Sequence, residues 1–126
     1  MNKLIVVASR ILMSQLFIIS GISKITGYTA TQTYMVHMGV PGSLLPLVIL
    51  TEVAGGLALL LGYRARITSF LLAGFTILAA MIFHHHFSDE MQLINFMKNL
   101  SIAGGLLLVV INGAGKPSLD LCQKAK

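Results

Sequence analysis

The chain has 126 residues, of which 56% are hydrophobic and only 10% are charged, whereas soluble domains average about 25% charged residues. This composition excludes an ordinary soluble domain and indicates a membrane protein. The formal net charge of +5 does not indicate nucleic-acid binding, because the basic residues lie in loops and tails and do not cluster with aromatic residues on one face. The single cysteine, Cys122, excludes an internal disulfide and a CxxC redox centre; we expect an unreactive thiol on the cytoplasmic side.

Four apolar segments approach the roughly 20 residues that a helix needs to cross a bilayer. A lipid-exposed backbone must satisfy its own hydrogen bonds, and these segments lack the strict alternation of a membrane barrel, so helices are expected. Arg10 interrupts the first segment, which favours a span over a cleaved signal peptide. The predicted fold class is all-α: an integral membrane four-helix bundle with up-down topology. It forms one domain over residues 1–126, with spans at about 4–23, 44–61, 67–83 and 94–111.

The connections between the spans carry recognisable turn signals. The longest connection covers residues 24–43, and within it the mildly amphipathic stretch Thr31–Met38 predicts a short helix in the membrane interface, ended by Gly39 and Pro41. Residues 62–66 predict a tight turn between the second and third spans, and Pro117 prevents the fourth helix from continuing.

Lysine and arginine residues predict the orientation of the bundle. With four spans, both termini and the second connection share one side of the membrane. We therefore expect both termini to be cytoplasmic, including a tail over residues 113–126. The basic residues on that side are Lys3, Arg64, Arg66, Lys116, Lys124 and Lys126.

Polar residues recur on one face of each span, at spacings of three, four and seven residues. Glu52 is the most unusual of them, because a carboxylate at this depth is costly and is a functional-site hypothesis by default. With a rise of about 1.5 Å per residue, the depths of the spans lead us to expect Arg10 or Lys98 as its partner. All four polar stripes are expected to face inward, including the one in the fourth span, which comprises Asn95, Lys98, Ser101, Gly105 and Asn112.

Ordinary structural roles remain open for these residues. Arg10 can extend to the cytoplasmic surface, Lys24 can be an interfacial anchor, and a paired Glu52 can clamp two helices together, whereas an unpaired Glu52 can carry a proton. The three consecutive histidines do not indicate a metal site, because neighbouring helix residues point about 100° apart. Only His84 continues the inward stripe of its span, and we expect it to form hydrogen bonds or handle protons.

Several short motifs, in this order and at these spacings, resemble the DoxX family of small bacterial inner-membrane proteins. The resemblance covers nearly the whole chain. The motifs are Arg10-Ile11-Leu12, Gly21-Ile22-Ser23-Lys24, Tyr34-Met35, Gly39-Val40-Pro41, Glu52 with Gly55-Gly56, Leu61-Gly62, Arg66, Phe83-His84, Phe96-Met97-Lys98-Asn99-Leu100 and Gly104-Gly105.

The resemblance implies a four-helix bundle in the bacterial inner membrane and a loose link to respiratory or redox chemistry. The family takes its name from a subunit associated with thiosulfate:quinone oxidation, and most members have no assigned activity. The four-helix layout is also similar to quinone-linked disulfide-forming enzymes, but this chain lacks their cysteine pair. A redox role therefore requires a partner subunit or a diffusible quinone.

We expect a polar head-group site inside the bundle, formed by Glu52, His84, Lys98 and Asn99, with Arg10 as a charge partner. A quinone is a candidate ligand because its carbonyls need donors and its ring needs apolar walls. The first hypothesis is a quinone- or redox-linked membrane subunit, whose own catalytic role stays open. The alternatives are a non-catalytic scaffold or complex subunit, and a small transporter, which needs a homo-oligomer because four spans are few.

Overall fold

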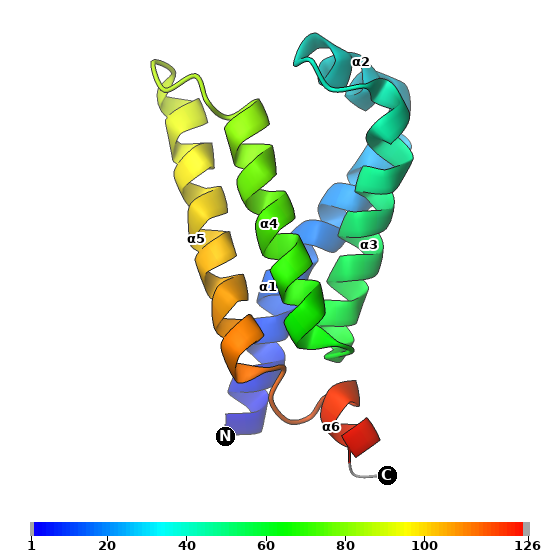
Figure 1. Ribbon diagram of the computed structural model, residues 1–126, viewed down its shortest axis with the longest axis vertical. Helices are drawn as coiled ribbons and strands as arrows, with labels where there is room; N and C mark the ends of the chain where they lie inside the picture. Colours follow the sequence, from blue (N-terminus) through cyan, green and yellow to red (C-terminus); the bar gives the residue numbers. More distant parts are fainter. Residues whose placement is uncertain (1, 125–126) are drawn as a thin grey trace.

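The structure is a computed structural model that describes residues 2–124, with side-chain surroundings through Leu121. All regular elements in that range are helical (Figure 1), and the four long ones have the length and composition to cross a membrane. The all-α four-helix prediction is therefore confirmed. The helices are α1 (Asn2–Thr26), α2 (Tyr28–His37), the short 3-10 helix η1 (Gly42–Leu44), α3 (Leu45–Leu61), α4 (Ala65–Phe83), α5 (Glu90–Asn112) and α6 (Leu119–Lys124). The Cys122 thiol and Lys126 lie outside the described part.

The loop signals are confirmed at the expected places. Gly62 ends α3 in a left-handed conformation, with a φ of 71°, and the amide of Tyr63 donates to the carbonyl of Ala58. This is a common way to satisfy the last carbonyls of a helix and reverse the chain. The short helix expected in the first connection is α2, which begins three residues earlier than predicted and is followed by Gly39 with a φ of 84°.

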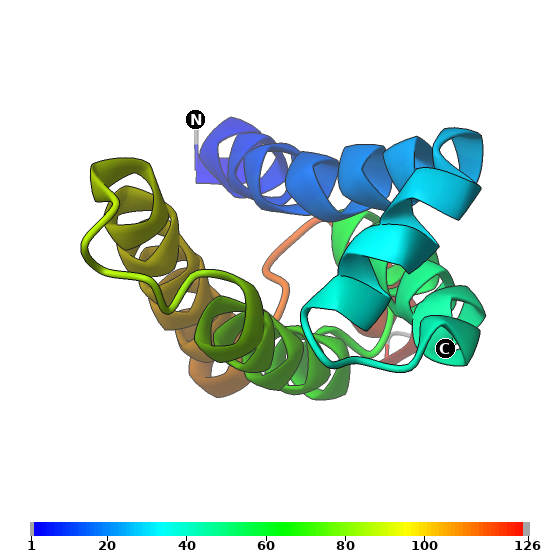
Figure 2. The ribbon, with the colours of Figure 1, turned by 90° about the horizontal axis from the view of Figure 1, so that it is seen from above.

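The four long helices form two closely packed pairs. Viewed from above (Figure 2), α1 runs along α3, and α5 runs along α4. The turn after α3 holds α3 and α4 together at the end that carries both termini, and the two helices diverge towards the other end, where α2 lies (Figure 1). The buried core draws on all four helices in the half nearer the termini; it comprises Phe17, Leu59, Leu72, Ala73, Ala103 and Leu106.

Glycines set the register between α1 and α3. A methyl group on Gly21 would lie 2.5 Å from Cγ2 of Val53, and one on Gly56 would lie 2.7 Å from Cγ1 of Ile18. Such approaches require glycine, as is common where membrane helices pack closely. In this antiparallel register Gly21 is level with Glu52, and Arg10 is level with Gly62.

The predicted polar stripe of α5 is wrong. Lys98, Ser101 and Asn112 are exposed, and the buried residues of this helix are Ala103 and Leu106. The inward face is shifted by about one residue, which rotates it by about 100°, because α5 packs on α4 through small and apolar side chains. Asn99 belongs to this inward face and Lys98 does not.

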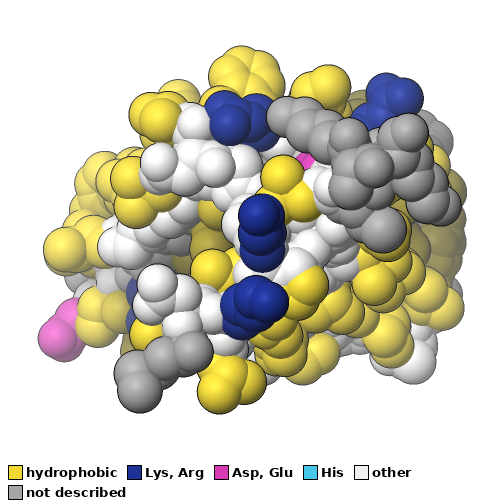
Figure 3. All heavy atoms as spheres, turned by 90° about the horizontal axis from the view of Figure 1, so that it is seen from below, with side chains coloured by type: hydrophobic (Ala, Val, Ile, Leu, Met, Phe, Trp, Pro, Cys, Tyr) yellow, Lys and Arg dark blue, Asp and Glu magenta, His cyan; other side chains and the backbone are white. Residues whose placement is uncertain are grey.

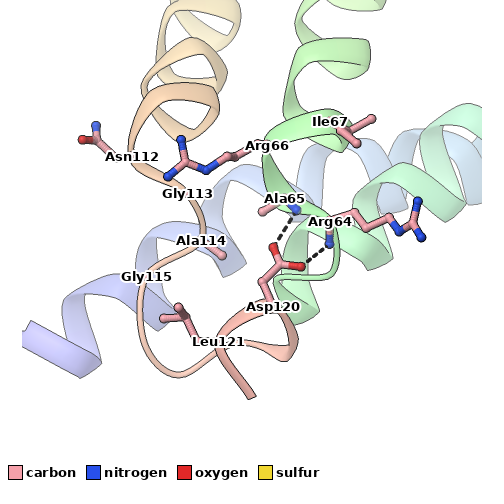
Figure 4. A pocket seen from close by; sticks show the side chains of 10 residues that line it. All are labelled: Arg64, Ala65, Arg66, Ile67, Asn112, Gly113, Ala114, Gly115, Asp120 and Leu121. Atoms are coloured by element: carbon pink, nitrogen blue, oxygen red, sulfur yellow. Dashed lines mark hydrogen bonds between the residues drawn. The ribbon is translucent and has the colours of Figure 1, made fainter. Parts of the chain in front are cut away.

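The tail after α5 folds back under the bundle and contains α6, which the sequence did not predict. The carboxylate of Asp120 accepts hydrogen bonds from the backbone amides of Arg64, at 2.6 Å, and Ala65, at 2.8 Å (Figure 4). The amide of Asp120 donates to the carbonyl of Gly62 at 3.0 Å. The first amides of α4 lack partners within the helix, so a carboxylate supplied by the tail stabilises the start of α4.

Replacing Asp120 with alanine is expected to lower the free energy of unfolding by about 1 kcal/mol, the usual effect of losing an N-terminal cap. Asp120→Asn removes the charge but keeps one acceptor oxygen, so it should lower the free energy of unfolding by less than Asp120→Ala does. Thermal unfolding in detergent micelles measures both effects. An Asp120→Ala protein that unfolds at the wild-type temperature, with a tail no more sensitive to protease, contradicts this role.

Candidate functional site

A cavity of about 480 Å³ lies where α3 and α4 diverge, in the half of the bundle away from the termini. Small-molecule sites typically measure about 300–1,000 Å³ and have mainly apolar walls with a few polar groups. We call this space the Glu52 cavity. Its walls are mostly aliphatic and aromatic, and its polar or titratable lining residues are Ser20, Lys24, Thr31, Tyr34, Thr51, Glu52, Thr76, His84 and Asn99.

An ion pair lies in the wall of the Glu52 cavity. Nζ of Lys24 is 2.7 Å from Oε1 of Glu52, and the side chains of the two residues are 27% and 4% exposed. The same Nζ donates to Oγ of Ser20 at 2.6 Å. The pair joins α1 to α3, one helical turn from the close approach of Gly21 to α3. Glu52 is therefore buried and partnered, as a carboxylate at this depth requires.

The expected partners of Glu52, Arg10 and Lys98, are both wrong. Arg10 is level with Gly62, ten residues further along α3, which is a separation of about 15 Å. The sequence placed Arg10 too deep because α1 extends past the end of α3. Lys98 lies on the exposed side of α5. Lys24, for which the role of an interfacial anchor was favoured, reaches back along α1 from its last turn and contacts Glu52.

Arg10 belongs to the opposite end of the molecule. Its side chain is buried, and Nη2 donates to the carbonyl oxygen of Pro117 in the tail. Burial excludes the simple surface extension that was one alternative. Arg10 therefore holds the tail against α1, and it does not line the Glu52 cavity.

His84 and Asn99 both line the Glu52 cavity, as expected for an inward site. Nδ1 of His84 is 2.9 Å from Oε1 of Gln92, which links the end of α4 to the first turns of α5. Nδ2 of Asn99 donates to the backbone carbonyl of Thr76 at 3.4 Å. The structure thus brings together three of the five expected residues.

Sequence reasoning missed Lys24 and Tyr34 as parts of the site. Lys24 shares a helix face with Gly21 and Phe17, which is one of the polar stripes expected to face inward, but it was not among the residues expected to form the site. Tyr34 comes from α2 and stacks on Phe83 of α4, with ring centroids 5.5 Å apart and an interplanar angle of 22°. No local pattern predicts that contact, because it depends on how α2 lies over the bundle.

A second cavity, of about 530 Å³, lies at the end with the termini, between the start of α4 and the tail (Figure 4). Its charged groups already serve the fold. Nη1 of Arg66 donates to the carbonyls of Val110 and Ile111, at 3.1 and 2.5 Å, and Asp120 caps α4. Lysine and arginine side chains are spread over this end (Figure 3). We therefore consider the Glu52 cavity the better candidate site.

Known proteins resemble this chain over most of its length. The DoxX family model matches residues 5–85. The inner membrane protein YqjF of Escherichia coli (strain K12) is 54% identical over 115 residues, which cover 91% of this chain and 88% of that protein. The inner membrane protein YphA of the same organism is 36% identical over 126 residues, covering 94% and 90%. No solved structure matches the chain.

These relatives and the four apolar helices identify a bacterial inner membrane protein. The family match includes every lining residue of the Glu52 cavity except Asn99. The resemblance expected from the sequence, including its YqjF-like branch, is confirmed, and the chain belongs to the DoxX family.

Proposed function

We propose that this protein is a quinone-binding membrane subunit of a redox system, with the quinone head group in the Glu52 cavity. The observation that supports this most strongly is an apolar cavity of about 480 Å³ with a hydrogen-bonding ion pair in its wall. The volume suits a small ring with part of its tail. A redox partner subunit supplies or accepts the electrons in this proposal.

The polar groups of the cavity suit a quinone ring. An ammonium group has three N–H donors; Nζ of Lys24 uses two of them, on Glu52 and Ser20, and the third is left for a quinone carbonyl. The side-chain amide of Asn99 has two N–H donors. One donates to the carbonyl of Thr76, and the other is left for the ligand. The rings of Phe75 and Phe83 supply aromatic wall. The proposed site therefore keeps Glu52, His84 and Asn99 from the sequence prediction and replaces Arg10 and Lys98 with Lys24.

We also propose that both termini face the cytoplasm. The exposed basic residues at the terminal end outnumber those at the other end, where Asp89 and Glu90 lie, as the positive-inside rule expects. The Glu52 cavity is then in the periplasmic half of the bilayer. The basic residues are Lys3, Arg64, Arg66 and Lys116.

Quinone binding can be measured directly because the chain contains no tryptophan. A Leu78→Trp variant places the sole indole on a residue that lines the Glu52 cavity. Titration with decylubiquinone, whose ring quenches indole fluorescence, is expected to give saturable quenching. Adding Asn99→Leu should weaken the apparent affinity by about threefold to tenfold, the effect of losing one hydrogen bond.

Phe70→Trp is the matched control for this titration. Phe70 lies on the same helix, is 62% exposed and does not line the cavity. It should show only the linear quenching caused by quinone dissolved in the micelle. Equal quenching of the two indoles, or a Leu78→Trp signal that Asn99→Leu leaves unchanged, contradicts quinone binding in this cavity.

A non-catalytic scaffold is the second candidate, and the ion pair itself favours it. Lys24 and Glu52 join α1 to α3 beside two tightly packed glycines, an arrangement that a structural clamp also needs. In a scaffold, Glu52→Gln changes stability or the recovery of partner proteins and leaves quinone quenching as it was. Co-purification from native membranes, beside the fluorescence titration, separates the two functions.

A further inference from the structure

The charges that line the Glu52 cavity cancel. Among its described lining residues, Lys24 and Glu52 are the two carrying a formal charge, and they pair with each other at 2.7 Å. His84, the other basic lining residue, faces the uncharged amide of Gln92. A ligand in this cavity therefore meets a wall with no net charge. Because its walls are mostly apolar, a charged head group entering this cavity would lose hydration without gaining an opposite charge.

The ion pair nevertheless keeps hydrogen-bonding capacity for a ligand. Lys24 engages two of its three N–H donors. Glu52 engages Oε1, and within residues 2–121 its Oε2 makes no hydrogen bond. One donor and one acceptor are thus left side by side. A head group that carries a hydroxyl donor and a second oxygen as an acceptor satisfies both of them.

The cavity also reaches the outer surface of the bundle. Leu47 on α3 and Leu78 on α4 both line it, and they are 59% and 57% exposed. Both lie on helices that cross the membrane, where the surrounding medium is the acyl chains of the bilayer. A ligand with a long tail can leave that tail between α3 and α4 while its head group occupies the cavity.

We propose that the Glu52 cavity takes a long-chain amphiphile with an uncharged head group from the bilayer, between α3 and α4. The Lys24–Glu52 pair sets this selectivity, because cancelling the two charges leaves hydrogen-bonding groups without an electrostatic preference for ions. This inference rests on the proposed function in treating the cavity as a ligand site. It extends that function from one ring system to a class of lipid, of which quinols and monoacylglycerols are examples.

The test compares three probes of equal chain length: monodecanoylglycerol, which is uncharged, decanoate, an anion, and decyltrimethylammonium, a cation. Native mass spectrometry of the full-length protein in a non-ionic detergent counts bound probe at equal concentrations. The wild-type protein should bind monodecanoylglycerol about tenfold or more tightly than either ion. Glu52→Gln leaves Lys24 as an uncancelled cation, so decanoate binding should rise by about tenfold, the scale of one partly screened charge interaction.

The double variant Lys24→Gln with Glu52→Gln removes both charges, and decanoate binding should return to the wild-type level. Thr51→Lys is a second way to add one cation. Thr51 lines the cavity beside an intact ion pair, so this variant should also gain decanoate even where Glu52→Gln does not fold.

Equal wild-type affinity for decanoate and monodecanoylglycerol overturns the inference. So does unchanged decanoate binding in a folded Glu52→Gln or Thr51→Lys protein. The proposed function fails separately: if decylubiquinone does not bind but the preference for uncharged heads holds, the selectivity stands and the quinone does not. If decylubiquinone binds but the affinities for decanoate and decyltrimethylammonium do not change in Glu52→Gln, the proposed quinone function stands and the inferred selectivity is wrong.

Discussion

Replacing Gly56 with leucine is expected to force α1 away from α3 and to lower the free energy of unfolding by about 3 kcal/mol, the upper part of the range for overpacking a close interface. A Cβ atom on Gly56 already meets Cγ1 of Ile18 at 2.7 Å and the backbone nitrogen of Ile18 at 3.2 Å. The side chain of Ile18 can turn away, but its backbone can move only with the whole of α1. Thermal unfolding in detergent, followed by circular dichroism, measures the loss.

Gly74 and Gly104 provide matched controls on the outer surface. A Cβ atom added to either helical glycine has no neighbour within 4 Å, so leucine fits without strain. Leucine is also a better helix former than glycine by up to about 1 kcal/mol, and Gly74→Leu and Gly104→Leu should unfold at or slightly above the wild-type temperature. If Gly56→Leu and Gly74→Leu unfold alike, close packing of α1 on α3 is not what Gly56 provides.

The helices could be predicted from the sequence because hydropathy and turn residues are local properties. Each expected span lies inside one long helix or its 3-10 extension, and Gly62 ends α3 at the start of the tight turn expected over residues 62–66. The number of apolar segments of about 20 residues gives the number of spans. The lack of strict apolar/polar alternation within these segments indicates helices and not strands. These features need no knowledge of which helix packs against which.

The partner of Glu52 could not be predicted, because it depends on the register between helices. The depth estimate assumed that all spans begin at the same membrane surface. In the structure α1 begins at Asn2 and extends past α3, so Arg10 lies level with the turn at Gly62. Lys24 therefore pairs with Glu52. An offset of a few residues is enough to exchange one cation for another.

Two other parts of the structure also lacked a local signal. On α5, Lys98 and Asn99 are neighbours in sequence, yet only Asn99 lines the cavity, because consecutive helix residues point about 100° apart. The cap on α4 comes from Asp120, more than fifty residues away along the chain. Polar residues within the spans indicate candidates for a membrane site. The rotation of each helix and contacts between distant parts of the chain determine which of these residues lie together.

Removing the positive charge of Lys24 is the substitution expected to affect the site most. Lys24→Met leaves Glu52, whose side chain is 4% exposed, without its partner. Breaking a buried ion pair from one side costs about 3–5 kcal/mol. The 27% exposure of the Lys24 side chain places the expected loss at the lower end of that range, about 3 kcal/mol. Thermal unfolding again measures it, together with the fraction of protein recovered from the membrane.

Lys98→Met is the control for the loss of a lysine as such. Lys98 is exposed on α5, and substitutions at exposed sites usually change stability by less than about 0.5 kcal/mol. If Lys24→Met and Lys98→Met unfold alike, the ion pair contributes nothing to the fold and its clamp role is wrong.

The double variant Lys24→Met with Glu52→Met separates stability from binding. Replacing both members of a buried pair by apolar side chains is often neutral or stabilising, and we expect it to unfold within about 1 kcal/mol of the wild-type protein. Because the bundle is then intact, the quinone titration can be repeated on it in the Leu78→Trp background. If a stable double variant loses the quenching, the ion pair is needed to bind the quinone. If the quenching is unchanged, the ion pair serves only the contact between α1 and α3.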